Sequence, residues 1–125
     1  MTARQAAFFL RAFGDATRLR IVAALSRRPM GLGELAKALK CPIQRAFRHL
    51  RYLHSRRLVE SKRAGNSVVY RLAKAQHRLH RLALGAVGSC LAEVDEVQQD
   101  SLRLGREAAG GSRAKGKRGG GGLTV

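Results

Sequence analysis

The chain has 125 residues, of which 45% are hydrophobic, so it can form one small domain with a core but not an elaborate enclosed active site. It carries 25 Lys and Arg against 8 Asp and Glu, a formal net charge of +17, so the expected partner is a polyanion: nucleic acid first, an acidic membrane surface second. No apolar run reaches the length of a membrane span, Arg11 interrupts the signal-like stretch AAFFL, and two cysteines exclude a disulfide scaffold. We therefore expect a cytoplasmic protein with no membrane partner.

Two helices are predicted at the start of the chain. Apolar residues at helical spacing predict the first over residues 2–13, with Gly14 ending it. Asp15 is a good N-cap for a second helix through ATRLRIVAALS, in which Arg18 and Arg20 are expected to stay in solvent.

The middle of the chain predicts two more helices followed by a hairpin. GELAKALK, residues 33–40, is a short third helix, and Pro42 suits the first turn of a fourth that runs to about residue 55. The strand-like runs LVESKR and SVVYRL are separated by the turn signal Gly65-Asn66.

The last part of the chain divides into a helix and a tail. A long helix is predicted from about Lys74 to Leu104, which closes a folded domain of residues 1–104. Residues 105–125 are glycine and cation with almost nothing to bury, so we expect them to be disordered.

The fourth helix, CPIQRAFRHLRYL, is apolar on one side and basic on the other. Its apolar side is expected to hold Ile43, Ala46, Phe47 and Leu50, with Leu53 at the edge. On the other side are Arg45, Arg48 and Tyr52, flanked by Gln44, His49 and Arg51. An isolated basic helix is usually only a solvated face. Here a short helix and a tight turn precede it, which is the helix-turn-helix arrangement.

A basic hairpin with Lys62 and Arg63 beside its turn follows at once, which predicts a winged helix-turn-helix, mainly α with a small β-hairpin. In such a fold the fourth helix enters the major groove of double-stranded DNA. The expected DNA-binding residues are Gln44, Arg45, Arg48, His49, Arg51, Lys62 and Arg63.

The runs FGDATRLRIVAAL, GELAKAL and FRHLRYLHSRRLVESKRAGNSVVYRL resemble the ArsR/SmtB family of bacterial transcriptional repressors, over roughly residues 5 to 100. The resemblance implies a homodimer that binds a two-fold symmetric operator and is released by an inducer. It also implies two metal sites, and both have lost their ligands here. The positions of the cysteine pair fall on Gly31 and Gly33, and those of the second site on Lys74, Gln76, Val87 and Cys90. No cofactor is therefore expected.

Two other sets of residues are candidates for sensing an inducer. His77 and His80 share a helix face and could bind zinc or nickel with carboxylates such as Glu93, but the neighbouring arginines make a polar surface the favoured interpretation. Cys41 precedes the fourth helix, whose N-terminus would lower a thiol pKa. Cys90 lies on an apolar stripe expected to form the α-helical dimer interface: Leu79, Ala83, Ala86, Val87, Cys90, Val94 and Val97. Apolar filler is the commoner role for a buried cysteine.

The leading hypothesis is a homodimeric, sequence-specific DNA-binding repressor. The alternative is a nonspecific nucleoid-type or RNA-binding protein that uses the same charge. An enzyme is not expected, because no nucleophile–base pair, phosphate loop or pair of catalytic carboxylates can be placed in a pocket.

Overall fold

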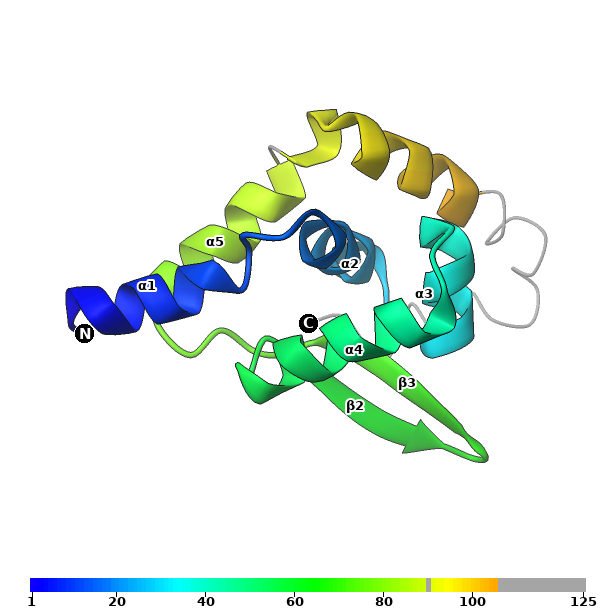
Figure 1. Ribbon diagram of the computed structural model, residues 1–125, viewed down its shortest axis with the longest axis horizontal. Helices are drawn as coiled ribbons and strands as arrows, with labels where there is room; N and C mark the ends of the chain where they lie inside the picture. Colours follow the sequence, from blue (N-terminus) through cyan, green and yellow to red (C-terminus); the bar gives the residue numbers. More distant parts are fainter. Residues whose placement is uncertain (90, 106–125) are drawn as a thin grey trace.

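The computed structural model describes residues 1–89 and 91–105, apart from the side chain of Ala92. Helices and a small sheet surround one core (Figure 1). The elements are, in chain order, α1 (Ala3–Arg11), α2 (Ala16–Arg27), β1 (Met30–Gly31), α3 (Leu32–Leu39), α4 (Ile43–Ser55), β2 (Val59–Ala64), β3 (Ser67–Leu72), α5 (Arg78–Ser89) and a 3-10 turn η1 (Leu91–Glu93). Residues 95–105 form one more helix, called the closing helix below. None of the helices in the described ranges combines the length and the apolar character that a membrane crossing requires.

The first four helices begin and end close to where the sequence predicted, because local caps determine their ends. The side chain of Thr2 accepts a hydrogen bond from the Gln5 backbone N–H and caps α1, and Asp15 caps α2 in the same way through the N–H of Arg18. At the end of α3, Lys40 takes the left-handed conformation with φ 51°. Its N–H and that of Cys41 both turn back to the carbonyl of Ala36, which produces the sharp turn into α4.

The sheet has three antiparallel strands in the order β1-β3-β2. The predicted hairpin β2–β3 is confirmed, and its register pairs Ala64 with Ser67 across a two-residue loop. Gly65 is the first loop residue and has φ 65°, as type II′ hairpin turns require. Strand β1 was not predicted, because two residues carry no periodicity. It pairs Met30 with Tyr70 and anchors the hairpin to the start of α3.

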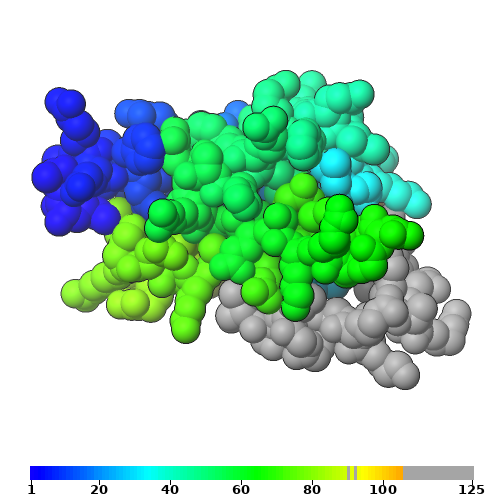
Figure 2. Space-filling model, turned by 90° about the horizontal axis from the view of Figure 1, so that it is seen from below, coloured from blue at the N-terminus to red at the C-terminus, as the bar shows by residue number. Residues whose placement is uncertain are grey.

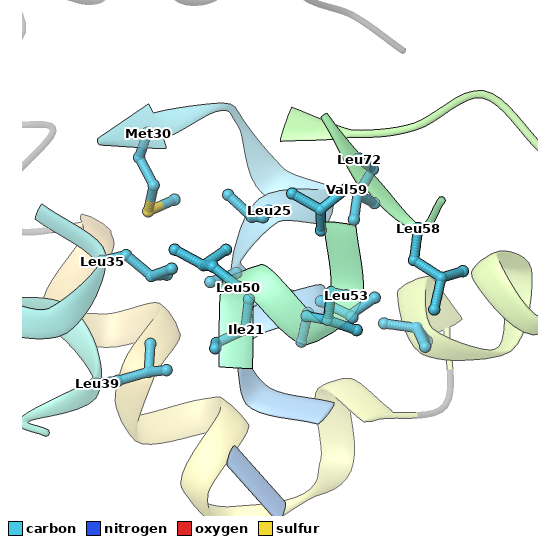
Figure 3. Packing of buried hydrophobic residues seen from close by; sticks show 14 of the residues in the cluster. Ile21, Leu25, Met30, Leu35, Leu39, Leu50, Leu53, Leu58, Val59 and Leu72 are labelled. Atoms are coloured by element: carbon cyan, nitrogen blue, oxygen red, sulfur yellow. The ribbon is translucent and has the colours of Figure 1, made fainter. Parts of the chain in front are cut away.

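The core is made mainly by α2, α3, α4 and the hairpin. Figure 3 shows Ile21 and Leu25 of α2 among Leu35, Leu39, Leu50 and Leu53. Val59, Leu72 and Met30 close the cluster from the sheet, and Leu58 closes it from the bend before β2. All ten of these side chains are almost completely buried. The packing of α2 and α3 against α4 fixes the direction in which the outer face of α4 points.

The expected long helix from Lys74 to Leu104 is wrong. The chain enters α5 only at Arg78, where the Nδ1 atom of His77 accepts the N–H of His80 and caps the helix. Helix α5 ends at Ser89, after Gly85 and Gly88, and glycine weakens a helix interior by about 1 kcal/mol. The closing helix then points in a different direction from α5 (Figure 1).

Because the predicted helix is interrupted after α5, part of the expected dimer interface is also wrong. Val87 and Val97 are buried in the core of their own chain and are not free to face a partner, whereas Leu79 and Ala83 are only partly buried against it and Val94 is 39% exposed. The prediction assumed one continuous helix with one apolar stripe, whereas α5 uses that stripe to cover α2. Cys90 lies outside the described residues.

The closing helix is held by a buried carboxylate. Asp100 accepts two hydrogen bonds from Arg20 of α2, at 2.9 Å from Nε and 2.8 Å from Nη2, and one from Arg103 at 2.7 Å. The same arginines donate to the carbonyl oxygens of Leu39 and Ala38 at the end of α3. Arg20 was expected to stay in solvent, and this was wrong because its partner lies 80 residues away in the sequence.

Candidate nucleic-acid interface

Helix α4 presents one continuous exposed face. Its buried side is formed by Ala46, Leu50 and Leu53, which are completely inaccessible. The exposed residues that point away from this side are called the α4 outer face below: Gln44, Arg45, Phe47, Arg48 and Arg51.

The sequence prediction is wrong about the burial of two apolar residues of α4. Ile43 and Phe47 were expected in the core, but they are 52% and 41% exposed. The buried arc of the helix is centred on Ala46, Leu50 and Leu53, and Phe47 lies beyond its edge.

His49 and Tyr52, in contrast, face inward from α4. The side chain of His49 is only 12% exposed, its Nε2 lies 3.7 Å from Asp15 Oδ2, and its Nδ1 is 3.4 Å from Nη1 of Arg18. Burial lowers the pKa of His49 below its usual 6.5, and the charges of Arg18, Arg48 and Arg45 lower it further against the opposing effect of Asp15. His49 is therefore mainly neutral at pH 7 and joins α4 to the start of α2.

Tyr52 lies between two cations instead of pointing to solvent as predicted. The guanidinium carbon of Arg18 is 4.1 Å from the Tyr52 ring centroid and that of Arg56 is 4.3 Å from it. Arg18 was also expected to be solvated, but it donates at 2.8 Å to the carbonyl of Ala12. These contacts stabilise the position of α4 on the two N-terminal helices.

The hairpin extends the basic surface next to α4. Residues 61–68, including Lys62 and Arg63, are all exposed on both sides of the turn. We call this hairpin the wing. Figure 2 looks onto the face that α4 and the wing share. The two places from which the sequence predicted DNA contacts are therefore adjacent on the surface, although His49 does not belong to it.

Charge on this face is of one sign. No acidic residue occurs between Glu34 and Glu60, and those two are paired with Arg28 and Arg71. Of the remaining described acidic residues, Asp15 caps α2, and Glu93, Asp95, Glu96 and Asp100 follow α5. The α4 outer face and the tip of the wing, residues 61–68, thus present cations without intervening carboxylates, and Glu60 at the base of the wing is paired with Arg71.

The histidines proposed as weak metal ligands are poorly suited to that role. The Nδ1 atoms of His77 and His80 both accept backbone N–H groups, at 3.1 and 3.0 Å. In a neutral ring the proton then sits on Nε2, which leaves neither nitrogen free to bind a cation. Within the described ranges, no three His, Cys, Asp or Glu side chains come together in a way that could hold a metal ion.

Cys41 lies in the turn between α3 and α4. Its side chain is half-buried and packs against the core, and its thiol is free. Modification of this sulfur would therefore disturb the turn that positions α4. The other candidate thiol, Cys90, and the tail from residue 106 onward lie outside the described residues.

Comparison with known proteins agrees with this geometry. Residues 13–62 match a family model described as a helix-turn-helix domain. The chain is 41% identical over 71 residues, 57% of its length, to the transcriptional repressor SmtB homolog of a Synechocystis species. The curated relatives that it matches are covered over only 54% and 58% of their own lengths.

Solved structures share the fold over most of the chain. The antimony-specific transcriptional repressor AntR superposes with a TM-score of 0.60 at 28% identity, covering 75% of this chain and 82% of AntR. A homodimeric winged helix-turn-helix DNA-binding domain from Mycobacterium bovis, described as a possible ArsR-family transcriptional regulator, gives a TM-score of 0.56 at 26% identity. That match covers 74% of this chain and 92% of the other.

A helix-turn-helix formed by α3 and α4, with a hairpin beside it, defines a winged helix-turn-helix protein. The matched helix-turn-helix segment and the relatives show what the chain is similar to: an SmtB-type transcriptional repressor and a possible ArsR-family regulator.

Proposed function

We propose that this chain is a sequence-specific transcriptional repressor that binds double-stranded DNA as a homodimer and is released by an inducer. The observation that carries the proposal is the α4 outer face, a basic surface with an exposed aromatic residue, placed beside a basic wing. The names of the relatives support it: two are called transcriptional repressors and one is a homodimeric DNA-binding domain. A repressor of this kind acts in the cytoplasm, where bacterial DNA is accessible.

Each residue of the α4 outer face has a distinct proposed role. Arg48 and Gln44 read base edges in the major groove, since Arg pairs with guanine and Gln with adenine. Phe47 contacts thymine methyl groups, and Arg51 reaches bases or the adjoining backbone. Arg45 lies at the edge of the helix nearer His49, and we propose that it contacts phosphate. His49 positions α4 from inside instead of touching DNA.

The inducer is not a metal bound at the two familiar family sites, because Gly31, Gly33, Lys74 and Val87 supply no ligand. Modification of Cys41 remains a proposed route for release, since this half-buried thiol lies in the turn of the helix-turn-helix. It predicts that oxidation weakens DNA binding by the wild type but not by Cys41→Ser.

Selection of bound fragments from the source genome tests the proposal. We expect a two-fold symmetric sequence with half-sites about 34 Å apart, bound at least about a thousandfold more tightly than a shuffled fragment. Equal binding of selected and shuffled fragments would instead support the nonspecific nucleoid-type alternative. If RNA competes with the selected DNA fragment as well as unlabelled DNA does, the RNA-binding alternative is supported.

Arg48→Ala and Arg45→Ala form a matched pair on the selected fragment. Arg48→Ala should cost about 1–3 kcal/mol of binding free energy and relax the preference at one position of each half-site. Arg45→Ala should weaken binding to the selected and the shuffled fragments by the same factor. If Arg48→Ala behaves in this second way, Arg48 contacts phosphate and the assignment of the face is wrong.

A further inference from the structure

A cavity of about 320 Å³ lies between α1, the end of α4 and the start of α5, on a different part of the molecule from the wing. This volume is at the lower end of the range of small-molecule sites. Its apolar walls come from Met1, Phe8 and Phe9 of the N-terminal segment. Arg56 and Arg57 line it from the end of α4, and His77 and His80 from the start of α5.

His80 brings a buried, unused hydrogen-bond donor to this cavity. Its side chain is 1% exposed, and its Nδ1 accepts the Gln76 N–H at 3.0 Å. Burial lowers the pKa of His80, as does the neighbouring His77, so the ring is neutral at pH 7. The proton then sits on Nε2, which has no hydrogen-bond partner within the described part of the chain. Buried donors without a partner are rare in folded proteins.

Arg56 brings a second buried hydrogen-bond donor that has no partner within the described residues. Its Nη2 donates to the Tyr52 hydroxyl at 2.8 Å, but its buried Nε has no partner among the described residues. The guanidinium is held between two rings, 3.9 Å from the centroid of Phe8 and 4.3 Å from that of Tyr52. It is therefore already oriented before any ligand is present.

Arg57 supports the same interpretation by its backbone. Its φ of 61° belongs to the Schellman motif that ends α4, in which the Arg57 N–H donates to His54 and the Leu58 N–H to Leu53, and this turn places its exposed cationic side chain at the cavity. The described lining residues include no carboxylate, so the two arginines are not neutralised inside it.

We propose that this cavity binds a small organic anion: a carboxylate carried on a flat, apolar body. The carboxylate would accept hydrogen bonds from Arg56 and from the imidazole N–H groups, with Arg57 supplying further positive charge, and the apolar body would lie against Phe8 and Phe9. A metal ion does not fit, because the two histidine rings offer donors and the arginines repel a cation.

Occupation of the cavity would also act on α4. Arg56 and Arg57 directly follow the last helical residue, Ser55, so an anion bound to them pulls on the end of the helix that carries the outer face. This regulatory step rests on the proposed function, whereas the binding itself does not.

Calorimetry with the full chain tests binding, with benzoate as the probe and benzyl alcohol and benzylamine as neutral and cationic analogues. We expect millimolar or tighter binding of benzoate, about tenfold weaker binding of benzyl alcohol, and none of benzylamine. Long-range ¹H–¹⁵N spectra should show the Nε2–H tautomer of His80 and a shift of that resonance with benzoate.

Arg56→Gln and Arg57→Gly should each weaken benzoate binding about tenfold. Glycine adopts φ 61° without strain, so Arg57→Gly keeps the fold, which thermal unfolding would verify. Arg63→Gln, in the wing, removes the same charge elsewhere and should bind benzoate as the wild type does.

The proposal would be overturned by equal binding of the neutral and anionic probes, by full benzoate affinity in both cavity variants, or by no binding at millimolar benzoate. Benzoate binding only to diluted, monomeric protein would show that the partner chain fills the cavity, which also contradicts it. In a separate measurement, benzoate should change the affinity for the selected DNA fragment. If benzoate binds but the affinity for the selected DNA fragment stays the same, the regulatory step alone is wrong. If the protein does not bind DNA at all, only the proposed function is contradicted.

Discussion

Asp100 is a single buried carboxylate that satisfies two arginines from different helices, Arg20 of α2 and Arg103 of the closing helix. Its side chain is 3% exposed, whereas the arginines keep about a fifth of their surface in solvent. The hydrogen bond to Asp100, weighed against burial, raises the pKa of Arg20, so Arg20 stays charged at any pH of interest.

Asp100→Asn should lower the free energy of unfolding by about 3 kcal/mol. This is the low end of the range for removing one partner of a buried pair, because both arginines are partly solvated. Urea denaturation at pH 7 measures the loss. Glu60→Gln is the matched control: it breaks the exposed pair with Arg71 and should cost less than about 1 kcal/mol. Equal losses in the two variants would mean that Asp100 contributes no more than a surface charge.

At the residue scale, the sequence mispredicts the burial of a side chain whose partner is distant in the sequence or that lies at the edge of the buried side of its helix. The pairing of Arg20 with Asp100 joins residues 80 apart, and no local pattern announces it. Phe47 was assigned to the core because it sits near the apolar side of its helix, but a helical wheel cannot say how wide the buried arc is. Tyr52 was assigned to solvent for the same reason.

Whole elements were more predictable than single side chains. Asp15 and Gly65 are local signals, and the cap and the turn that they indicated are present, so the start of α2 and the hairpin were correct. The helix after residue 73 was extended too far in both directions. The start of α5 was missed because a histidine cap such as His77 has no strong sequence signature. The end of α5 at Ser89 was missed because the apolar stripe continues past it into the closing helix.

The wing is the element whose proposed contribution is charge alone. Lys62→Gln and Arg63→Gln should each reduce the slope of log affinity against log salt concentration by about one, on selected and shuffled DNA alike. Titrations at several salt concentrations measure this slope. Arg81→Gln removes an exposed cation from α5 instead and should leave the slope unchanged. Loss of preference between the two DNA fragments in a wing variant would show that the wing reads bases.

At the scale of the whole molecule, several large apolar side chains remain exposed on the single chain. Leu82 of α5 is 62% exposed and Leu102 of the closing helix 59%, and Phe8 and Leu10 of α1 are 48% and 46% exposed. We propose that some of these side chains are covered by a partner chain. Val87 and Val97 of the predicted seam are buried in their own chain, so we place the proposed dimer contact on Leu82 and Leu102, with Val94 as the predicted seam residue that remains exposed.

Leu82→Glu should therefore shift the proposed dimer toward monomer, by about 2 kcal/mol or roughly 30-fold in the dissociation constant if Leu82 is a central contact. The physical reason is that dimerisation would have to bury a carboxylate with no partner in an apolar contact. Sedimentation equilibrium over a range of protein concentrations measures the shift, and circular dichroism shows that the helices remain. Val68→Glu is the control, since Val68 is 40% exposed but lies on the wing, and it should dimerise as the wild type does. A Leu82→Glu protein that still dimerises with wild-type affinity would exclude the α5 surface. A second variant, Leu102→Glu, would then test whether the closing helix forms the contact by itself.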